Sequence, residues 1–488
     1  MQESFRNLLA DAIGEESLDR ALAGLGGEAS VSLRLNPFKR AVPFPGTSSP
    51  VLPAGEDVWE CSESKPVLPT GEDVWEFSEG KPVPWSSWGR LLPVRPAFTL
   101  DPLFHAGAYY VQDSSAMYVG EALRHLLPRL ERPADRPVRV LDLCAAPGGK
   151  TTDAAASLRE AFGDSYLLIS NEIMRNRAGV LSDNVAIWGD PCVAVSSLDP
   201  AAFAALPDFF DIIIADVPCS GEGMFRKDSR ALEQWSEDNV ALCARRQRRI
   251  VADVWPALRP GGIFIYSTCT FNRMENDGNV EWIRDEMGAE LLDLPLGYEG
   301  LIATEYGCSL VPGFVPGEGQ YCAALRKEGA PSLRGTRTPK RALPVPSVDR
   351  RGAARVEQLF GIPVSVRAKG ELLTALPQGI APSLQSFESA LPLLSGGCAA
   401  GRVKGSDFVP DADLALCIAL REDAFVRVEV DRETALAFLH RDNICLSDSP
   451  SGLLLLCYRE VPLGFVKNLG RRCNSILPQS RRIRMDLR

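Results

Sequence analysis

Residues 138–152 read VRVLDLCAAPGGKTT, and this stretch decides the fold. Its first six residues, Val138 to Leu143, form a short and mostly apolar run typical of a buried strand. A loop of small residues follows, and we expect a helix to begin near Gly149. In an open sheet of parallel strands, such a junction lies at the carboxyl edge, where ligands bind. The stretch therefore predicts a ligand-binding loop in an α/β fold.

The alternation of strands and helices continues downstream of this loop. Further buried strands are expected at 166–169, 210–215 and 262–267, the last of them after a turn at 259–262. A helix is expected over 236–258, with Ser236 as its N-cap. Such alternation predicts a doubly wound parallel sheet with helices on both faces.

A chain of 488 residues is too long for one ordinary core, so several domains are expected. The segment VLPAGEDVWECSESKP from Val51 is repeated almost unchanged as VLPTGEDVWEFSEGKP from Val67, which favours a duplication in a surface loop. We predict an N-terminal α/β domain over 1–100 with this insert at 51–82, a domain with the ligand-binding loop over 101–326, a Pro- and Arg-rich linker over 327–355 and a C-terminal α/β region over 356–488.

The composition is that of a soluble globular protein, with 45% hydrophobic and 24% charged residues. Neither a signal peptide nor an apolar run long enough for a membrane span is expected, which favours the cytoplasm. None of the 13 cysteines forms a C-x-x-C pair, so we expect reduced thiols and no metal site. Because the net charge is −10, any nucleic-acid contact must use local clusters of positive charge.

The loop after the first strand does not match the common phosphate-binding patterns. A P-loop would need glycine where Cys144 stands, and no G-x-G-x-x-G pattern is present. Glu172 follows the second expected strand, and Asp199 follows the place where a third would end. An acid there can accept hydrogen bonds from ribose hydroxyls, although most acids after strands are helix caps or solvated. Their order behind a glycine loop favours a nucleoside ligand.

Two further motifs follow buried strands, DVPCSGEGMFRK at 216–227 and STCTFN at 267–272. Because parallel strands end at one edge of a sheet, Asp216, Cys219 and Cys269 are expected to meet there. A lone free cysteine is more often a small apolar filler than a nucleophile. Two cysteines on adjacent loops beside a ligand loop are harder to dismiss as fillers.

Taken together, these motifs resemble the Sun-type RNA cytosine-5 methyltransferases, and most of all their bacterial RsmF-type branch. The resemblance implies a Rossmann-like class I methyltransferase fold with a C-terminal PUA-like RNA-binding region. The duplicated insert departs from the family pattern, so nothing is carried across it. The matching segments are CAAPGGK at 144–150, NE at 171–172, PCSGEG with Arg226-Lys227, STCTFN with Glu275-Asn276, YVQDSS at 110–115, GRVK at 401–404 and GFVKNLG at 464–470.

The resemblance also implies roles for individual residues, with S-adenosylmethionine as the cofactor. Cys269 matches the nucleophile that attacks C6 of cytosine, and Cys219 matches the cysteine implicated in product release. Asp216 is the carboxyl group that we expect to hydrogen-bond the ring at N3 and N4. The residues expected to line the cofactor pocket are Cys144, Ala145, Ala146, Pro147, Gly148, Gly149, Lys150, Glu172, Asp199 and Asp216.

Positive charge gathers in the C-terminal tail, which predicts contacts with RNA phosphates. The residues concerned are Lys467, Arg471, Arg472, Arg481 and Arg482. The resemblance implies small-subunit ribosomal RNA as the substrate and a monomer with no membrane partner. Three alternatives stay open: a tRNA methyltransferase, a DNA-type enzyme that attacks through Cys219 and leaves Cys269 unexplained, and an idle RNA-binding assembly factor.

Overall fold

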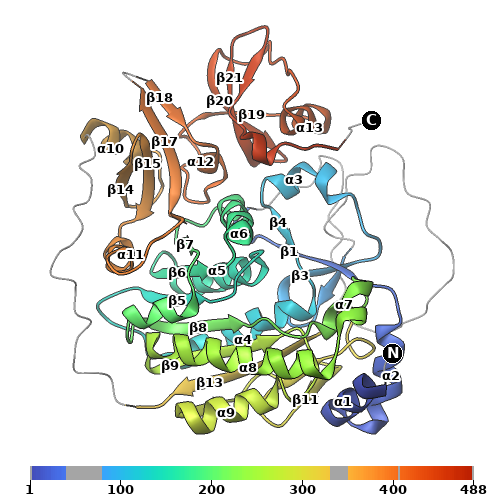
Figure 1. The fold of residues 1–488 in the computed structure, drawn as a ribbon. Helices are drawn as coiled ribbons and strands as arrows, with labels where there is room; N and C mark the ends of the chain where they lie inside the picture. The colour runs from blue at the N-terminus through green and yellow to red at the C-terminus, as the bar shows by residue number, and fades with distance from the viewer. Residues whose placement is uncertain (1–2, 40–79, 330–349, 405–406, 486–488) are drawn as a thin grey trace.

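The computed structural model describes residues 3–39, 80–329, 350–404 and 407–485 (Figure 1). Most of the duplicated insert and residues 330–349 of the expected linker lie outside these ranges. No helix in the described ranges is long and apolar enough to cross a bilayer.

A ten-stranded sheet forms the centre of the molecule, in the order β11-β12-β13-β9-β8-β5-β6-β7-β16, with β10 beside β13. Strands β5 to β9 pair in parallel, and β13 runs antiparallel to β9. This arrangement confirms the predicted α/β fold class. The strands are β5 (Val138–Asp142), β6 (Tyr166–Asn171), β7 (Val193–Ser196), β8 (Phe210–Asp216), β9 (Leu258–Thr268), β10 (Ala289–Leu292), β11 (Leu301–Ala303), β12 (Cys308–Leu310), β13 (Gln320–Lys327) and β16 (Ser395–Gly396).

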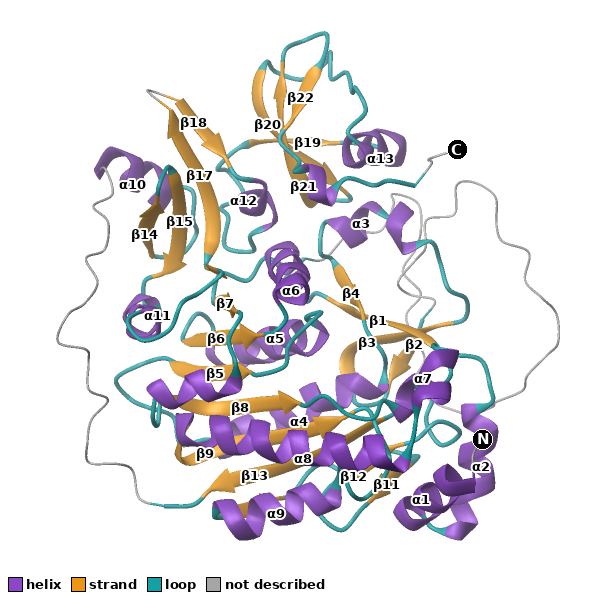
Figure 2. Cartoon of the chain, viewed as in Figure 1, coloured by secondary structure: helices purple, strands orange, loops and turns teal. Residues whose placement is uncertain are grey.

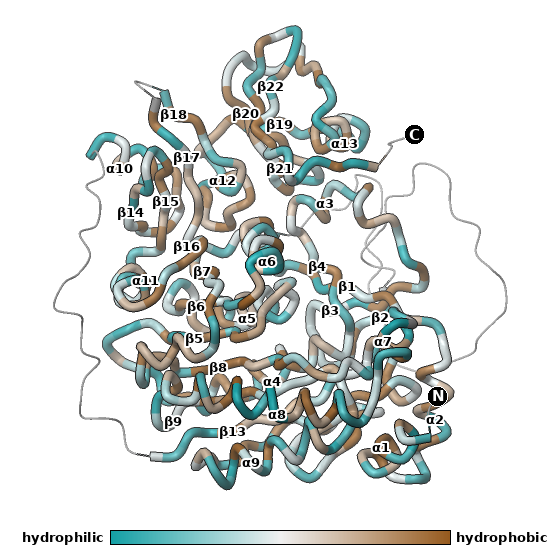
Figure 3. The backbone as a smooth tube through the Cα atoms, viewed as in Figure 1, coloured by the Kyte–Doolittle hydropathy of each residue, from teal (hydrophilic) through white to brown (hydrophobic). Residues whose placement is uncertain are grey.

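Helices cover the two faces of this sheet (Figure 2). Helix α4 packs against α5, β9 and β13, whereas α8 packs against α9. The hydrophobic stretches of Figure 3 fall on the central strands such as β8, whose residues 210–215 are all buried. The helices are α4 (Tyr118–Leu126), α5 (Gly149–Phe162), α6 (Arg175–Trp188), α7 (Ser229–Gln234), α8 (Glu237–Val254) and α9 (Asp277–Met287).

Two local predictions in this region can be compared with the structure. Ser236 caps α8, since its side chain accepts a hydrogen bond from the backbone N–H of Asn239. The turn expected at 259–262 is instead part of β9, where the pairing register with β8 shifts after Phe210. Gly261 has a φ of 72°, which an L side chain rarely adopts. The Pro-Gly-Gly sequence that predicted a turn therefore forms an irregularity within the strand.

The N-terminal part contains a four-stranded sheet in the order β2-β3-β1-β4. Two helices precede this sheet, and they are separated at Gly14, where φ is 86°. These helices pack against Phe225, Trp235 and Phe271, near the two cysteine motifs. The elements are α1 (Glu3–Ile13), α2 (Glu15–Leu25), β1 (Val31–Leu35), β2 (Lys81–Val83), β3 (Ser86–Leu92), α3 (Pro102–His105) and β4 (Tyr109–Val111).

The C-terminal part contains two four-stranded sheets, ordered β14-β15-β17-β18 and β19-β20-β21-β22. Its short strand β16 joins the central sheet by pairing antiparallel with β7. Helix α10 begins at Arg350, inside the expected linker, and the domain boundaries stay a prediction. The elements are α10 (Arg350–Glu357), β14 (Val364–Lys369), β15 (Leu372–Pro377), α11 (Ala381–Glu388), β17 (Cys398–Lys404), β18 (Asp407–Pro410), α12 (Ala412–Leu416), β19 (Val426–Glu429), α13 (Arg432–His440), β20 (Gly452–Tyr458), β21 (Val461–Asn468) and β22 (Cys473–Ser475).

Candidate active site at the carboxyl edge of the central sheet

The loop between β5 and α5 is fixed by the neighbouring strands. The backbone N–H of Leu143 donates to the carbonyl of Ile214 at 2.9 Å, and that of Ala145 donates to the carbonyl of Asn171 at 2.8 Å. Gly148 has a φ of 115°, and a Cβ atom there would lie 3.2 Å from Leu181. The small residues therefore let the loop turn tightly into α5, which begins at Gly149 as expected.

An ion pair connects this loop to the end of β8. Lys150 Nζ lies 2.9 Å from Asp216 Oδ2. The other oxygen, Oδ1, accepts hydrogen bonds from Ser267 Oγ at 2.8 Å and Gln320 Nε2 at 3.1 Å. Burial acts to lower the pKa of Lys150, but the Asp216 carboxylate outweighs it and the net pKa is raised. Lys150 is therefore a stable cation, and the ion pair fixes the position of the Asp216 side chain beside the loop.

Asp142, at the end of β5, adds a second acid beside the loop. Its Oδ2 accepts from Thr151 Oγ1 at 2.6 Å, while its buried Oδ1 has no hydrogen-bond partner among the described residues. Burial, together with repulsion from the Asp216 and Glu172 carboxylates, raises the pKa of Asp142 to about 7. Cys144 lies in the same electrostatic environment, and burial first of all raises the pKa of its thiol. The region is thus rich in acid, with Lys150 and Arg177 as compensating cations.

The two acids predicted to bind ribose differ in their surroundings. Glu172 is buried after β6, accepts from the backbone N–H of Met174 at 3.0 Å and pairs with Arg177 at 3.1 Å. Asp199 is exposed, and its Oδ1 accepts from the backbone N–H of Ala201 at 3.0 Å. Asp199 therefore caps the short helical turn that begins at Pro200. The ribose role of both acids stays a prediction.

Cys219 and Cys269 meet as the order of the strands predicted. Their Sγ atoms lie 3.2 Å apart, which is hydrogen-bond distance for thiols and too long for a disulfide. The hydrogen bond with Cys269, followed by burial, raises the pKa of Cys219 well above its ordinary value. The Cys219 thiol therefore resists deprotonation while it lies beside the Cys269 sulfur.

Two buried glutamates join the cysteine loops. Glu275 accepts from the backbone N–H of Ser220 at 3.0 Å and from Gln247 Nε2 at 2.7 Å. Glu222 accepts from the backbone N–H of Phe271 at 2.7 Å, so each loop holds the other through a carboxylate. Sequence reasoning noted Glu222 and Glu275 only as parts of family motifs and gave neither a role.

Gln320 and Arg226 connect the end of β8 and the Cys219 loop to β13 and to the N-terminal part. Gln320, at the start of β13, is almost fully buried and donates to Asp216. Arg226 pairs with Glu318 at 2.8 Å and donates to the carbonyl of Glu28 at 3.1 Å. No sequence signal pointed to Gln320, since it lies 104 residues from Asp216.

The residues at this edge fit S-adenosylmethionine. The small residues of the loop leave its backbone accessible, and Asp142 offers a buried oxygen without a partner. Three acids, Asp142, Glu172 and Asp216, interact electrostatically there, and Lys150 and Arg177 act against them. Such a site suits a ligand with an ammonium group, a sulfonium centre and a ribose diol.

The residues predicted to contact RNA lie together in the C-terminal part. Lys467, Arg471, Arg472 and Arg482 are exposed. Arg481 is mostly buried, because it pairs with Asp413 at 2.7 Å and with Asp183 at 3.6 Å. The first four are free to meet a phosphate, whereas Arg481 ties the tail to α6 and α12. The RNA role of all five stays a prediction.

Comparisons with known proteins agree with this geometry. Residues 130–326 match the family model described as 16S rRNA methyltransferase RsmB/F, and residues 425–483 match the methyltransferase RsmF PUA domain. Among curated proteins, ribosomal RNA small subunit methyltransferase F of Pectobacterium atrosepticum is 31% identical over 81% of this chain and 83% of its own length. The protein of the same name from Klebsiella pneumoniae is 38% identical over 46% of each chain.

A solved structure supports the fold alone. The crystal structure of PH0851 matches with a TM-score of 0.50 and 18% identity, over 66% of this chain and 65% of its own. The extensive match to the curated relatives identifies the family. The chain therefore belongs to the RsmF-type ribosomal RNA small subunit methyltransferases, within the RsmB/F family.

Proposed function

We propose that this chain methylates C5 of a cytosine in small-subunit ribosomal RNA, with Cys269 as the covalent nucleophile. The observation that carries the proposal is the Cys219–Cys269 contact at 3.2 Å, together with the Lys150–Asp216 ion pair at 2.9 Å. Lys150 also acts electrostatically on Cys269, so the ion pair and the thiols belong to one site.

Covalent addition is needed because C5 of an intact cytosine ring is a poor nucleophile. Attack of the Cys269 thiolate on C6 breaks the aromaticity and makes C5 electron-rich. Bound S-adenosylmethionine supplies the electrophilic methyl group. Cys219, whose thiol resists deprotonation, lies within hydrogen-bond distance of the Cys269 sulfur that attacks.

Lys150 and Asp216 are suited to stabilise the ring as the adduct forms. The Asp216 side chain at the end of β8 can hydrogen-bond the ring at N3 and N4. The Lys150 ammonium beside it is the donor for the negative charge that develops on the ring.

Product release requires a base for the C5 proton. While Cys269 is free, its hydrogen bond keeps Cys219 protonated. Once Cys269 is bonded to C6, that contribution to the raised pKa is removed. Cys219 then ionises more readily, takes up the C5 proton and allows Cys269 to be eliminated.

The test uses tritiated S-adenosylmethionine and small ribosomal subunits from a strain that lacks the gene. Cys269→Ala is expected to abolish methyl transfer, and Cys219→Ala to accumulate a protein–RNA adduct on a denaturing gel. Retained turnover in Cys269→Ala would refute its role as nucleophile. Cys243→Ala, a buried cysteine on α8, is the matched control and should behave as the wild type.

The same subunits can identify the target nucleotide. Bisulfite sequencing of the RNA before and after incubation with the wild-type protein should show one new protected cytosine. Transfer to tRNA in place of small-subunit RNA would contradict the proposed substrate. We also propose that the chain acts in the cytoplasm as a monomer, which sedimentation with and without RNA can check.

A further inference from the structure

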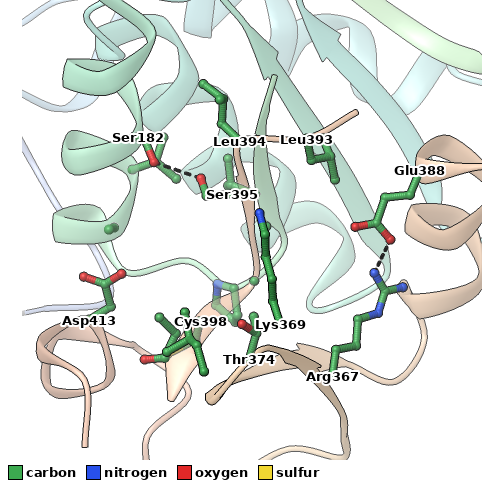
Figure 4. Close-up of a pocket in the computed structure, with 18 of the residues that line it drawn as sticks. Ser182, Arg367, Lys369, Thr374, Glu388, Leu393, Leu394, Ser395, Cys398 and Asp413 are labelled. Carbon is green, nitrogen blue, oxygen red and sulfur yellow. Dashed lines mark hydrogen bonds and ion pairs between the residues drawn. The ribbon is translucent and has the colours of Figure 1, made fainter. Parts of the chain in front are cut away.

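A cavity of about 790 Å³ lies between the central sheet and the C-terminal part (Figure 4). Helix α6 and the start of β7 form one wall, and β14, β15, α11 and β17 contribute the others. No residue of the cofactor loop or of the two cysteine motifs lines it. The cavity is therefore separate from the candidate active site, and its volume is that of a small-ligand pocket.

The charged groups of the cavity leave one cation without a counterion. Arg367 pairs with Glu388, Asp190 pairs with Arg159 and Asp413 pairs with Arg481. Lys369, the last residue of β14, is exposed and has no ion pair with any described residue. Figure 4 shows its side chain extending across the cavity toward Ser395. The uncompensated charge inside the cavity is thus a single positive one.

The rest of the lining is apolar with a few hydroxyl groups. An apolar surface is formed by Leu372, Leu393 and Leu394. The side chain of Leu394 is 48% exposed. The hydroxyls of Ser182 and Ser395 lie 2.9 Å apart across the boundary between the two walls. A ligand for this lining needs a flat apolar part, hydrogen-bonding edges and one negative charge.

We propose that this cavity binds one internal nucleotide of the RNA substrate, with its phosphodiester at Lys369 and its base against the leucines. An internal phosphodiester carries one negative charge, which matches the one free cation. A free nucleotide or a terminal phosphate carries about two charges and would call for a second free cation. This inference rests on the proposed function, because RNA is the substrate that it supplies.

The cavity also adjoins the basic tail that the sequence singled out for RNA. Arg481 of the tail reaches Asp413 in the cavity wall and Asp183 on α6. An RNA strand on the exposed arginines Arg471, Arg472 and Arg482 would therefore lie on the same part of the molecule. The cavity gives that strand a place to insert a base away from the reacting cytosine.

The experiment measures methylation of the same small ribosomal subunits by the full chain at several salt concentrations. Lys369→Gln is expected to raise KM for the subunits about fivefold and to leave kcat unchanged. The slope of log kcat/KM against log salt should fall in magnitude by about one, as for the loss of one phosphate contact. Lys369→Arg should restore KM, and Thr374→Trp, which fills the cavity, should raise it as well.

Arg249→Gln is the matched control, because Arg249 is an exposed cation on α8. Wild-type KM and salt slope in both Lys369→Gln and Thr374→Trp would overturn the inference. Tight binding of cytidine 5′-monophosphate by the wild type, lost in Lys369→Gln, would overturn the assignment to an internal nucleotide. A wild-type chain that does not methylate the subunits would refute the proposed function instead.

Discussion

At the scale of single residues, Asp142 shows how the candidate site is prepared for a cationic ligand. Its carboxyl group is fully buried, and only Thr151 donates to it. The environment disfavours its charged form, so its pKa is raised from 3.8 to about 7. The folded protein therefore keeps a proton on Asp142 at pH values where the unfolded chain has already lost it.

This difference predicts a pH dependence of stability. Between about pH 4 and pH 7 the folded state binds more protons at Asp142 than the unfolded state, so the free energy of unfolding falls as pH rises. Asp142→Asn removes this loss. The free energy of unfolding of Asp142→Asn, relative to that of the wild type, should increase by at most about 4 kcal/mol between about pH 4 and pH 7. Above about pH 7 this difference should stay constant. Urea denaturation of the cofactor-free protein at a series of pH values measures the difference.

An exposed aspartate provides the control for this prediction. Asp448→Asn changes a solvent-exposed carboxyl group in the C-terminal part. Its stability should follow that of the wild type across the same pH range. A constant difference between Asp142→Asn and the wild type from pH 4 to pH 8 would show that the folded state does not hold this proton.

Sequence reasoning predicted the site residues that lie at strand ends. It gave no role to the residues whose side chains join one loop to another by hydrogen bonds. Cys219, Cys269 and Asp216 follow buried strands, so the topology of a parallel sheet alone brings them together. The bridging role of Glu222 could not be predicted, because the PCSGEG motif does not show which loop its glutamate contacts. Its burial depends on a loop about 50 residues away.

At the scale of elements, the parallel strands were predictable and their outer neighbour was not. Strands β5, β6 and β8 are runs of buried apolar residues that end in polar loops. Strand β16 has only two residues, Ser395 and Gly396, and no periodicity. It pairs with β7 because the C-terminal part folds back on the central sheet, and no local pattern encodes that contact.

Strand β1 contacts the end of the cofactor loop through Arg34, whose side chain is fully buried. Arg34 donates to Gln112 Oε1 at 2.8 Å, to the carbonyl of Gly149 at 3.2 Å and to Thr152 Oγ1 at 2.5 Å. It also lies 3.7 Å from Asp153. The N-terminal sheet thereby holds the first turn of α5, which is where the cofactor loop ends.

Replacing this arginine tests the connection between the two elements. Arg34→Met should lower the free energy of unfolding by about 3 kcal/mol, since it breaks a buried, hydrogen-bonded ion pair. It should also raise the Kd for S-adenosylmethionine, because the start of α5 loses its support. Urea denaturation and titration calorimetry measure the two effects. Arg230→Met, which breaks an exposed pair with Asp228, should change neither, and equal behaviour of the two variants would contradict the role of Arg34.

At the scale of the whole molecule, the C-terminal part shares a core with the central sheet. Leu376, Ile380, Leu384 and Phe387 belong to the same buried cluster as the central strands. Arg139 of β5 donates to Ser383 Oγ at 3.1 Å across this boundary. The region around α11 should therefore unfold together with the central sheet, although the sequence suggests separate domains joined by a linker.

Phe387 is the residue through which this coupling can be measured. Its ring lies 6.1 Å from that of Phe209 and 6.4 Å from that of Phe203, and it is fully buried. Phe387→Ala should cost about 3–5 kcal/mol. Since the cost falls on the shared core, it should lower the calorimetric transition that S-adenosylmethionine stabilises, even though Phe387 lies on α11.

Phe425→Ala separates this coupling from a general loss of stability. Phe425 packs on Phe465 at 4.7 Å within the C-terminal part and does not contact the central sheet core. Its replacement should therefore lower the transition of the C-terminal sheets more than the one stabilised by S-adenosylmethionine. If Phe387→Ala also left the cofactor-stabilised transition at its wild-type temperature, the two parts would be independent domains. In that case, bound RNA would have to fix the position of the protein's basic C-terminal tail relative to Cys219 and Cys269.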